Sequence, residues 1–163
     1  PLQLVPLLED PDAVLDARLI ARGPRVFGLI CGTEDLATAM GGEAAPDVLR
    51  LPKLLVHLAA KAARVRSFGV LRSVADFSDT QGIASAAFEA RRFGFDGATC
   101  IHPKVVPVLN EAFSPTADEI DHAERLVAAA EAAFAEGRGA FAFEGAMVDK
   151  PIVERARALL EQR

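Results

Sequence analysis

The sequence reads LQLVPLLE at residues 2–9 and RVFGLICGTED at residues 25–35. Both stretches are apolar runs of strand length that close on an acidic residue, Glu9 in the first and Asp35 in the second. A helical pattern lies between the two runs, so the unit is predicted to be strand, helix, strand. A right-handed crossover places the carboxyl ends of both strands at the same edge of a parallel sheet. The two acidic side chains are therefore expected to converge at the edge where α/β proteins bind ligands.

Two carboxylates without a neighbouring Cys or His make an oxygen-rich site, and such a site suits Mg²⁺. This ion usually takes one or two protein carboxylates and leaves its other positions to substrate and water. Glu9 and Asp35 are therefore candidate metal ligands. The alternative is that each acidic residue only caps the helix after its strand, which is a common position for such residues. Position in the sequence does not decide between the two.

Two further strand candidates, at residues 67–71 and 98–101, extend the pattern to four βα units. Helices are predicted over residues 12–21, 46–63 and 79–93, because apolar residues recur there at helical spacing. In the longest of these helices the residues expected to face inward are Leu49, Leu54, Leu55, Leu58 and Ala62. Four βα units fit either a small open α/β domain or half of an eight-unit barrel, and composition does not decide between them.

After the fourth strand candidate the pattern changes. A short helix is predicted to begin at His102, and a capping box at residues 116–119 begins a long helix. A short apolar piece at residues 140–143 then leads to EGAMVD at residues 144–149 and to a last helix with Pro151 in its first turn. No further strand is expected. Helices without a strand to return to pack either on a neighbouring subunit or back on their own.

Composition excludes several classes of protein. Of the 163 residues 51% are hydrophobic, which is enough for a substantial core. The net charge is -5 and the sequence has no block of Lys and Arg, which argues against nucleic acid as the main partner. No apolar run approaches the ~20 residues that span a bilayer, so no membrane association is expected. Cys31 and Cys100 stand in unrelated contexts, which predicts buried small side chains and a reducing, cytoplasmic environment.

Four ordered motifs resemble the later part of one protein family. They are LVPLLE at residues 4–9, GTEDL at 32–36, GFDGATCIHP at 94–103 and EGAMVD at 144–149. In order and spacing they resemble the HpcH/HpaI aldolase and citrate lyase β-subunit superfamily, and within it the citrate lyase β-like CoA-ester lyases. The resemblance implies a TIM (β/α)8 barrel. Residues 1–112 would be barrel strands five to eight, and residues 113–163 a C-terminal helical extension that packs on a neighbouring subunit of a homo-oligomer, a trimer or hexamer.

The resemblance also implies an activity, the Mg²⁺-dependent cleavage of a 3-hydroxy-acyl-CoA such as citramalyl-CoA or malyl-CoA to acetyl-CoA and a 2-oxo acid. Glu9 and Asp35 would bind Mg²⁺ and, through it, the substrate. Glu34 and Asp35 would also offer backbone N–H groups to the substrate carboxylate. Ile101 and His102 would contact the substrate or the CoA arm.

Glu144 is the candidate catalytic acid/base for the acetyl-CoA carbon. The family's CoA lyases usually have an Asp at this position, supplied by a neighbouring subunit. The alternative is a solvated carboxylate in a turn, and the sequence favours neither. His57 and His122 have no acidic or Cys partner at ligand spacing, so both are expected to be helix-surface or packing residues.

Other activities stay open at this point. A malyl-CoA thioesterase needs only that water reach the same acyl group. A class II pyruvate aldolase uses the same metal pair without CoA, although the Met-Val-Asp motif argues against it. A non-catalytic homologue or assembly subunit is a third reading, because the family's first barrel half, with the Arg that clamps the substrate carboxylate, is absent. Since the chain also begins at Pro1 and not at Met, we expect it to be part of a longer protein.

Overall fold

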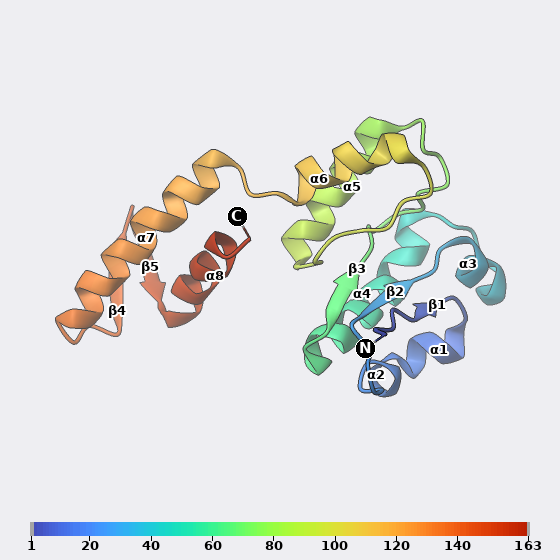
Figure 1. The fold of residues 1–163 in the computed structure, drawn as a ribbon, viewed down its shortest axis with the longest axis horizontal. Coiled ribbons are helices and arrows are strands. Elements are labelled where there is room, and N and C mark those ends of the chain that lie inside the picture. Colours follow the sequence, from blue (N-terminus) through green and yellow to red (C-terminus); the bar gives the residue numbers. More distant parts are fainter. Residues whose placement is uncertain (1, 163) are drawn as a thin grey trace. The chain divides into compact units, whose positions relative to one another are not determined.

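The computed structural model describes residues 2–162, and the chain divides into two compact units, one up to Phe113 and one from Ser114 (Figure 1). The elements of unit 1 are β1 (Leu7–Leu8), α1 (Pro11–Leu15), α2 (Ala17–Ile20), β2 (Gly28–Cys31), α3 (Glu34–Met40), α4 (Pro46–Ala63), β3 (Arg66–Phe68), α5 (Thr80–Phe93), η1 (Pro103–Val105) and α6 (Val106–Phe113). Those of unit 2 are α7 (Ala117–Ala135), β4 (Ala140–Phe143), β5 (Ala146–Asp149) and α8 (Lys150–Leu160).

Unit 1 is built on a parallel sheet in the sequential order β1-β2-β3. This order confirms the predicted βα repeat for the first three units. The fourth strand candidate, residues 98–101, is not a strand. The chain makes a single parallel bridge to β3, between Phe68 and Gly97, and then leaves the sheet. One bridge does not make a ladder, so the prediction was wrong in both position and length.

The sheet has one face covered by helices. Leu8, Leu29 and Cys31 point to that face and pack with residues of α1, α2 and α4. On the other face Leu7, one residue before Leu8, is 50% exposed, and Ile30 is only half-buried. Sequential parallel strands with their helices on one face are the arrangement of a (β/α)8 barrel, whose inner face is filled by side chains of the other strands. Of the two folds that the sequence left open, this geometry favours part of a barrel.

Helix α4 begins and ends as predicted, but its buried face differs from the prediction. Leu55 is 40% exposed and Leu58 is 62% exposed, and Ala62 is exposed as well. The residues that α4 buries are Leu49, Pro52, Lys53, Val56, His57 and Ala60. The prediction followed the leucines, whereas the 3.6-residue period of the buried face passes through smaller and polar residues.

The helix caps predicted from the sequence agree with the structure better than the predicted buried faces do. Asp79 accepts a hydrogen bond from the backbone N–H of Gly82 and so caps α5, which ends at Gly94 with a left-handed φ of 92°. The capping box of α7 is present at Thr116 and Glu119. The helix predicted over residues 12–21 is divided at Asp16 into α1 and α2. Within residues 2–162 no helix is both long and apolar enough to cross a membrane.

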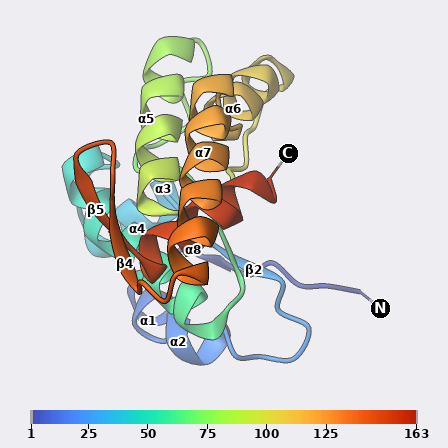
Figure 2. The ribbon, with the colours of Figure 1, turned by 90° about the vertical axis from the view of Figure 1, so that its left-hand side faces the viewer.

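Unit 2 contains a β-hairpin, which the sequence analysis missed when it expected only helices after residue 101. Strands β4 and β5 pair antiparallel and run side by side (Figure 2). Their inward residues Phe141 and Val148 are buried with residues of α7 and α8. Glu144 and Gly145 form the turn, both with positive φ, as the two-residue turns of tight hairpins require.

Candidate metal and substrate site

Strands β1 and β2 end side by side, and this places Glu9 beside the start of α3. The Gly32 N–H donates to the Leu8 carbonyl at 2.7 Å, which joins the two strand ends. A hydrogen bond with Asp35 raises the pKa of Glu9 above its usual value, and the loss of hydration and the charges of Asp35 and Asp10 act in the same direction. The structure therefore brings together the two carboxylates that the sequence singled out.

The structure also tests whether these residues are only helix caps. The N-cap of α1 is Asp10, whose side chain accepts the Ala13 N–H at 2.9 Å. The N-cap of α3 is Thr33, and Asp35 follows within the first turn. Neither Glu9 nor Asp35 thus occupies a cap position. The alternative that these two residues only cap the helices after their strands is therefore not supported.

The pair fits a hard divalent cation by its chemistry. Two neighbouring carboxylates repel each other once both are ionised, and a cation between them removes this repulsion. Among residues 2–162 no group of three or more His, Cys, Asp or Glu side chains is placed to hold a metal ion. Two carboxylates are nevertheless the usual protein share of a Mg²⁺ site, because this ion keeps several positions for water and substrate.

Gly32 allows Glu9 its position. A Cβ atom on Gly32 would lie 2.9 Å from the Cβ of Glu9 and 3.2 Å from its Cα. The first distance is shorter than Cβ atoms in contact tolerate, and the second is a tight contact that requires a small shift of Glu9. Since one of the two atoms belongs to the backbone, the strand end itself would have to move.

We expect Gly32→Ala to displace Glu9 and to weaken Mg²⁺ binding by about 10–100-fold, the size of effect seen when the support of a metal ligand is lost. Isothermal titration with Mg²⁺ measures the change. Gly42→Ala is the matched control, because its Cβ would meet no atom closer than 3.6 Å. Equal Mg²⁺ affinity in the two variants would contradict the role of Gly32.

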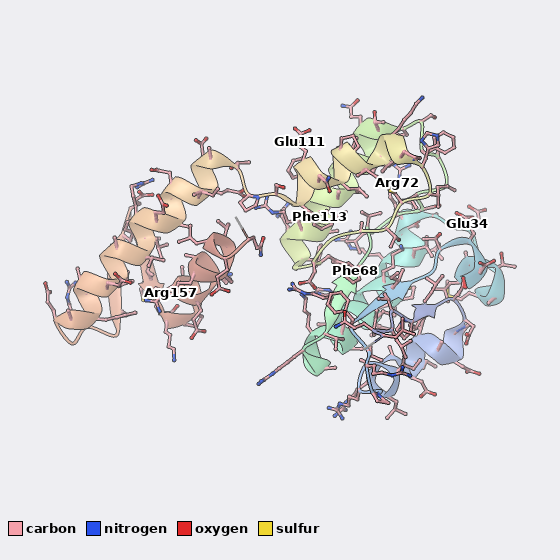
Figure 3. All side chains as sticks on the ribbon, viewed as in Figure 1. Glu34, Phe68, Arg72, Glu111, Phe113 and Arg157 are labelled. Atoms are coloured by element: carbon pink, nitrogen blue, oxygen red, sulfur yellow. The ribbon has the colours of Figure 1, made fainter. Side chains whose placement is uncertain are left out.

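Glu34 precedes Asp35 and is tied to the loop after β3. The Ser73 hydroxyl donates to Oε1 of Glu34 at 2.5 Å. In the same loop Arg72 forms an ion pair with Asp79 at 2.8 Å. Figure 3 labels Glu34 and Arg72, which come from the segments after β2 and β3. The loops that follow two neighbouring strands are thus linked at the carboxyl edge of the sheet.

Ile101 and His102 lie in the segment after the bridge at Gly97. Ile101 is 69% exposed. The Nδ1 atom of His102 accepts the Lys104 N–H at 3.1 Å, and its ring stacks on Phe77 with the centroids 4.4 Å apart. A neutral His102 therefore carries its proton on Nε2, which is left as a donor. The contact of both residues with substrate stays a prediction.

Glu144 lies in the hairpin turn of unit 2 and is bonded to α7. Arg125 donates a hydrogen bond to its Oε1, and Nδ1 of His122 lies 3.2 Å from its Oε2. His122 therefore has an acidic partner, which the sequence analysis did not foresee because the two residues are far apart in the chain. Glu144 adopts a left-handed φ of 49°, which costs a residue other than glycine roughly 1–2 kcal/mol.

Asp149 is a second carboxylate of the hairpin, and the sequence analysis gave it no role. It is half-buried at the N-cap position of α8, but its side chain makes no cap hydrogen bond. Within the described residues it forms no ion pair either. The strand alternation places it on the same face as Met147, which is 72% exposed. A surface hollow on the hairpin is lined by Ala140, Phe141, Ala142, Gly145, Ala146 and Met147.

Comparison with known proteins agrees with the motifs. The model of the family described as HpcH/HpaI aldolase/citrate lyase matches residues 1–103. The chain belongs to this family. The citrate lyase subunit beta of Escherichia coli (strain K12) is 33% identical over 162 residues, which are 98% of this chain and 53% of that protein. A (3S)-malyl-CoA thioesterase of Cereibacter sphaeroides is 35% identical over 160 residues, 98% of this chain and 56% of the relative.

A solved structure of a family member supports the fold. The protein CitE of Mycobacterium tuberculosis, in complex with magnesium, acetoacetate and coenzyme A, superposes with a TM-score of 0.85 at 31% identity. The match covers 99% of this chain and 61% of that protein. The fold is therefore that of part of a TIM (β/α)8 barrel followed by the C-terminal unit. The chain spans about half the length of the curated relatives it matches.

Three residues near the sheet, Cys31, Lys53 and His57, are buried. His57 is buried, stacks on Phe95 at 4.3 Å and lies 3.0 Å from the Ser67 hydroxyl, which confirms the predicted packing role. Burial raises the pKa of Cys31 to about 11, so its thiol is inert at neutral pH. Burial also lowers the pKa of Lys53 to about 8. The sequence analysis missed Lys53, since a lysine is rarely buried.

Proposed function

We propose that the protein is a Mg²⁺-dependent carbon–carbon lyase that cleaves a 3-hydroxy-acyl-CoA of the citramalyl-CoA or malyl-CoA type to acetyl-CoA and a 2-oxo acid. The observation that carries the proposal is the pairing of Glu9 with Asp35 at the carboxyl edge of the sheet. Family membership supports it, as does the relative whose structure holds magnesium, acetoacetate and coenzyme A. In the reaction the substrate hydroxyl loses its proton, the carbon–carbon bond breaks, and its electron pair forms the acetyl-CoA enolate.

Each residue has a task in this scheme. Glu9 and Asp35 would hold Mg²⁺, which when bound supplies positive charge to the oxygen atoms of the substrate hydroxyl and carboxylate. The backbone N–H groups of Glu34 and Asp35, at the start of α3, would donate to the substrate carboxylate. Ile101 and His102 would contact the acyl group or the CoA arm from the next loop.

The acid/base that protonates the enolate is assigned to the hairpin, which carries two carboxylates. Glu144 is the residue that the sequence predicted. The geometry favours Asp149, because one oxygen of Glu144 accepts a hydrogen bond from Arg125 and the other lies 3.2 Å from Nδ1 of His122, whereas Asp149 makes no cap hydrogen bond and lies on the face with Met147. A carboxylate with open lone pairs beside apolar side chains is the better proton carrier.

A malyl-CoA thioesterase is the second candidate, since a relative of that name is 35% identical to this chain. The products of malyl-CoA distinguish the two activities. A lyase releases a 2-oxo acid and no free thiol, and a thioesterase releases the CoA thiol and malate. We expect the intact protein with Mg²⁺ to form a 2-oxo acid from malyl-CoA, measured as its phenylhydrazone. This formation should stop when a chelator is added. Thiol release without 2-oxo acid would overturn the lyase assignment.

The same scheme includes a homo-oligomer, a trimer or hexamer, in which unit 2 packs on a neighbouring subunit and brings the hairpin carboxylate to its site. The exposed Met147 on the outer face of the hairpin supports this arrangement. Light scattering on the intact protein tests it. We expect a mass of three or six subunits, and a monomer with full lyase activity would contradict the arrangement.

A further inference from the structure

The hairpin turn is held to α7 from two sides. Arg125 and His122 are three residues apart on α7 and therefore lie on one face of the helix. Each faces a different oxygen of Glu144: Arg125 donates to Oε1, and Nδ1 of His122 lies 3.2 Å from Oε2. No carboxylate oxygen of Glu144 is left without one of these partners.

The partners of Glu144 are themselves fixed. The Nε atom of Arg125 donates to Oδ2 of Asp121 at 3.0 Å, so the guanidinium is held at both ends. The His122 ring packs edge-on against Phe143, the last residue of β4, with the centroids 5.6 Å apart. A side chain held in this way sets the orientation of the turn, and the turn joins β4 to β5, which ends at Asp149.

We infer that Asp121, His122, Arg125 and Glu144 form a turn clamp that positions the β4–β5 hairpin, and that Glu144 is a positioning residue and not the proton carrier. The inference rests on the proposed function, in which the hairpin supplies the acid/base. It explains why a glutamate occupies a left-handed turn position, where only a long side chain reaches both Arg125 and His122. The central contact of the clamp is the ion pair between Arg125 and Glu144.

Charge reversal tests the clamp. Arg125→Glu and Glu144→Arg place like charges together, so each single variant should lower kcat for malyl-CoA about 10–100-fold with KM unchanged, as expected from a misplaced acid/base. The double variant restores the ion pair between positions 125 and 144, but it leaves Asp121 beside a like charge and His122 without its acceptor, so it should recover part of the lost kcat and not all of it. Arg138→Gln is the matched control, because it removes an exposed Arg–Glu pair of the same unit, and it should leave kcat unchanged.

The outcomes separate the clamp from the proposed function. If the double variant is folded and no faster than either single variant, the clamp is overturned, whereas the lyase assignment stands. Should the reversed variants fail to fold, Arg125→Lys and Arg125→Gln replace them. If the clamp is right, Arg125→Lys should retain kcat and Arg125→Gln should lower it by about tenfold or less, as Glu144→Gln should. Equal rates of the two Arg125 variants would overturn the clamp. If the wild-type protein releases no 2-oxo acid from malyl-CoA, the proposed function is overturned instead.

Discussion

We expect Asp35→Ala to lower the Mg²⁺-dependent turnover of malyl-CoA by more than about 10³-fold and to leave the fold intact. A metal ion that stabilises the developing charge contributes several kcal/mol, and each loss of about 1.4 kcal/mol is a tenfold loss of rate. Asp35 is exposed in the first turn of α3, so its removal leaves no cavity in the core. Steady-state kinetics at saturating Mg²⁺ and a thermal melt measure the two parts of the prediction.

Asp10→Ser is the matched control for this experiment. It removes a neighbouring negative charge and keeps a side chain that can cap α1, so both turnover and stability should stay close to those of the wild type. If Asp35→Ala keeps full activity in the presence of a chelator, the assignment of the metal site to this pair is wrong. Titration with Mg²⁺ adds a readout without turnover, since the variant should bind the ion much more weakly.

The raised pKa of Glu9 gives the pair a pH dependence. Because Asp35 raises the pKa of Glu9, the carboxyl group stays protonated to a higher pH than a free glutamate does. Protons and Mg²⁺ compete for the same oxygen atoms. The affinity for Mg²⁺ should therefore fall as the pH drops through that raised pKa, and Asp35→Ala should move the midpoint of this loss to lower pH.

The fold was predictable where local chemistry decides it. The bounds of α4, the Asp79 cap of α5, the capping box at Thr116 and the Pro151 position in α8 all follow from short-range signals, and all are present. The meeting of Glu9 and Asp35 was also expected, since it needs only the handedness of one βα crossover. The caps and helix bounds depend on residues that are neighbours in the chain, and the carboxylate pair depends on a single βα crossover.

The misses depend on residues that are far apart. Leu55 and Leu58 appeared to belong to the core of α4, but the sheet and α2 select the face with Val56 and Ala60. The hairpin was missed because its turn is Glu-Gly, and the usual signal for such a turn is Asn-Gly or Asp-Gly. The pairing of His122 with Glu144 needs that hairpin, so it could not be seen without it.

The second large effect is expected at Asp149. Asp149→Asn removes the titrating group at nearly constant size, so kcat should fall by roughly 10²–10⁴-fold, the usual contribution of an acid/base. Mg²⁺ affinity and the KM for malyl-CoA should stay unchanged, because the metal pair lies in unit 1. Asparagine is as good a helix cap as aspartate, so α8 should not be destabilised. Kinetics and Mg²⁺ titration on the same preparation measure both parts.

Glu144→Gln decides which of the two carboxylates acts. If Asp149 carries the proton, the Gln variant only weakens the contacts with Arg125 and His122, and kcat should fall about tenfold or less. Asp118→Asn, which removes an exposed carboxylate from the first turn of α7, is the control for a change of charge in this unit. A fall of 10²–10⁴-fold in Glu144→Gln together with an active Asp149→Asn would return the role to Glu144. Unchanged rates in both variants would place the proton donor outside the hairpin.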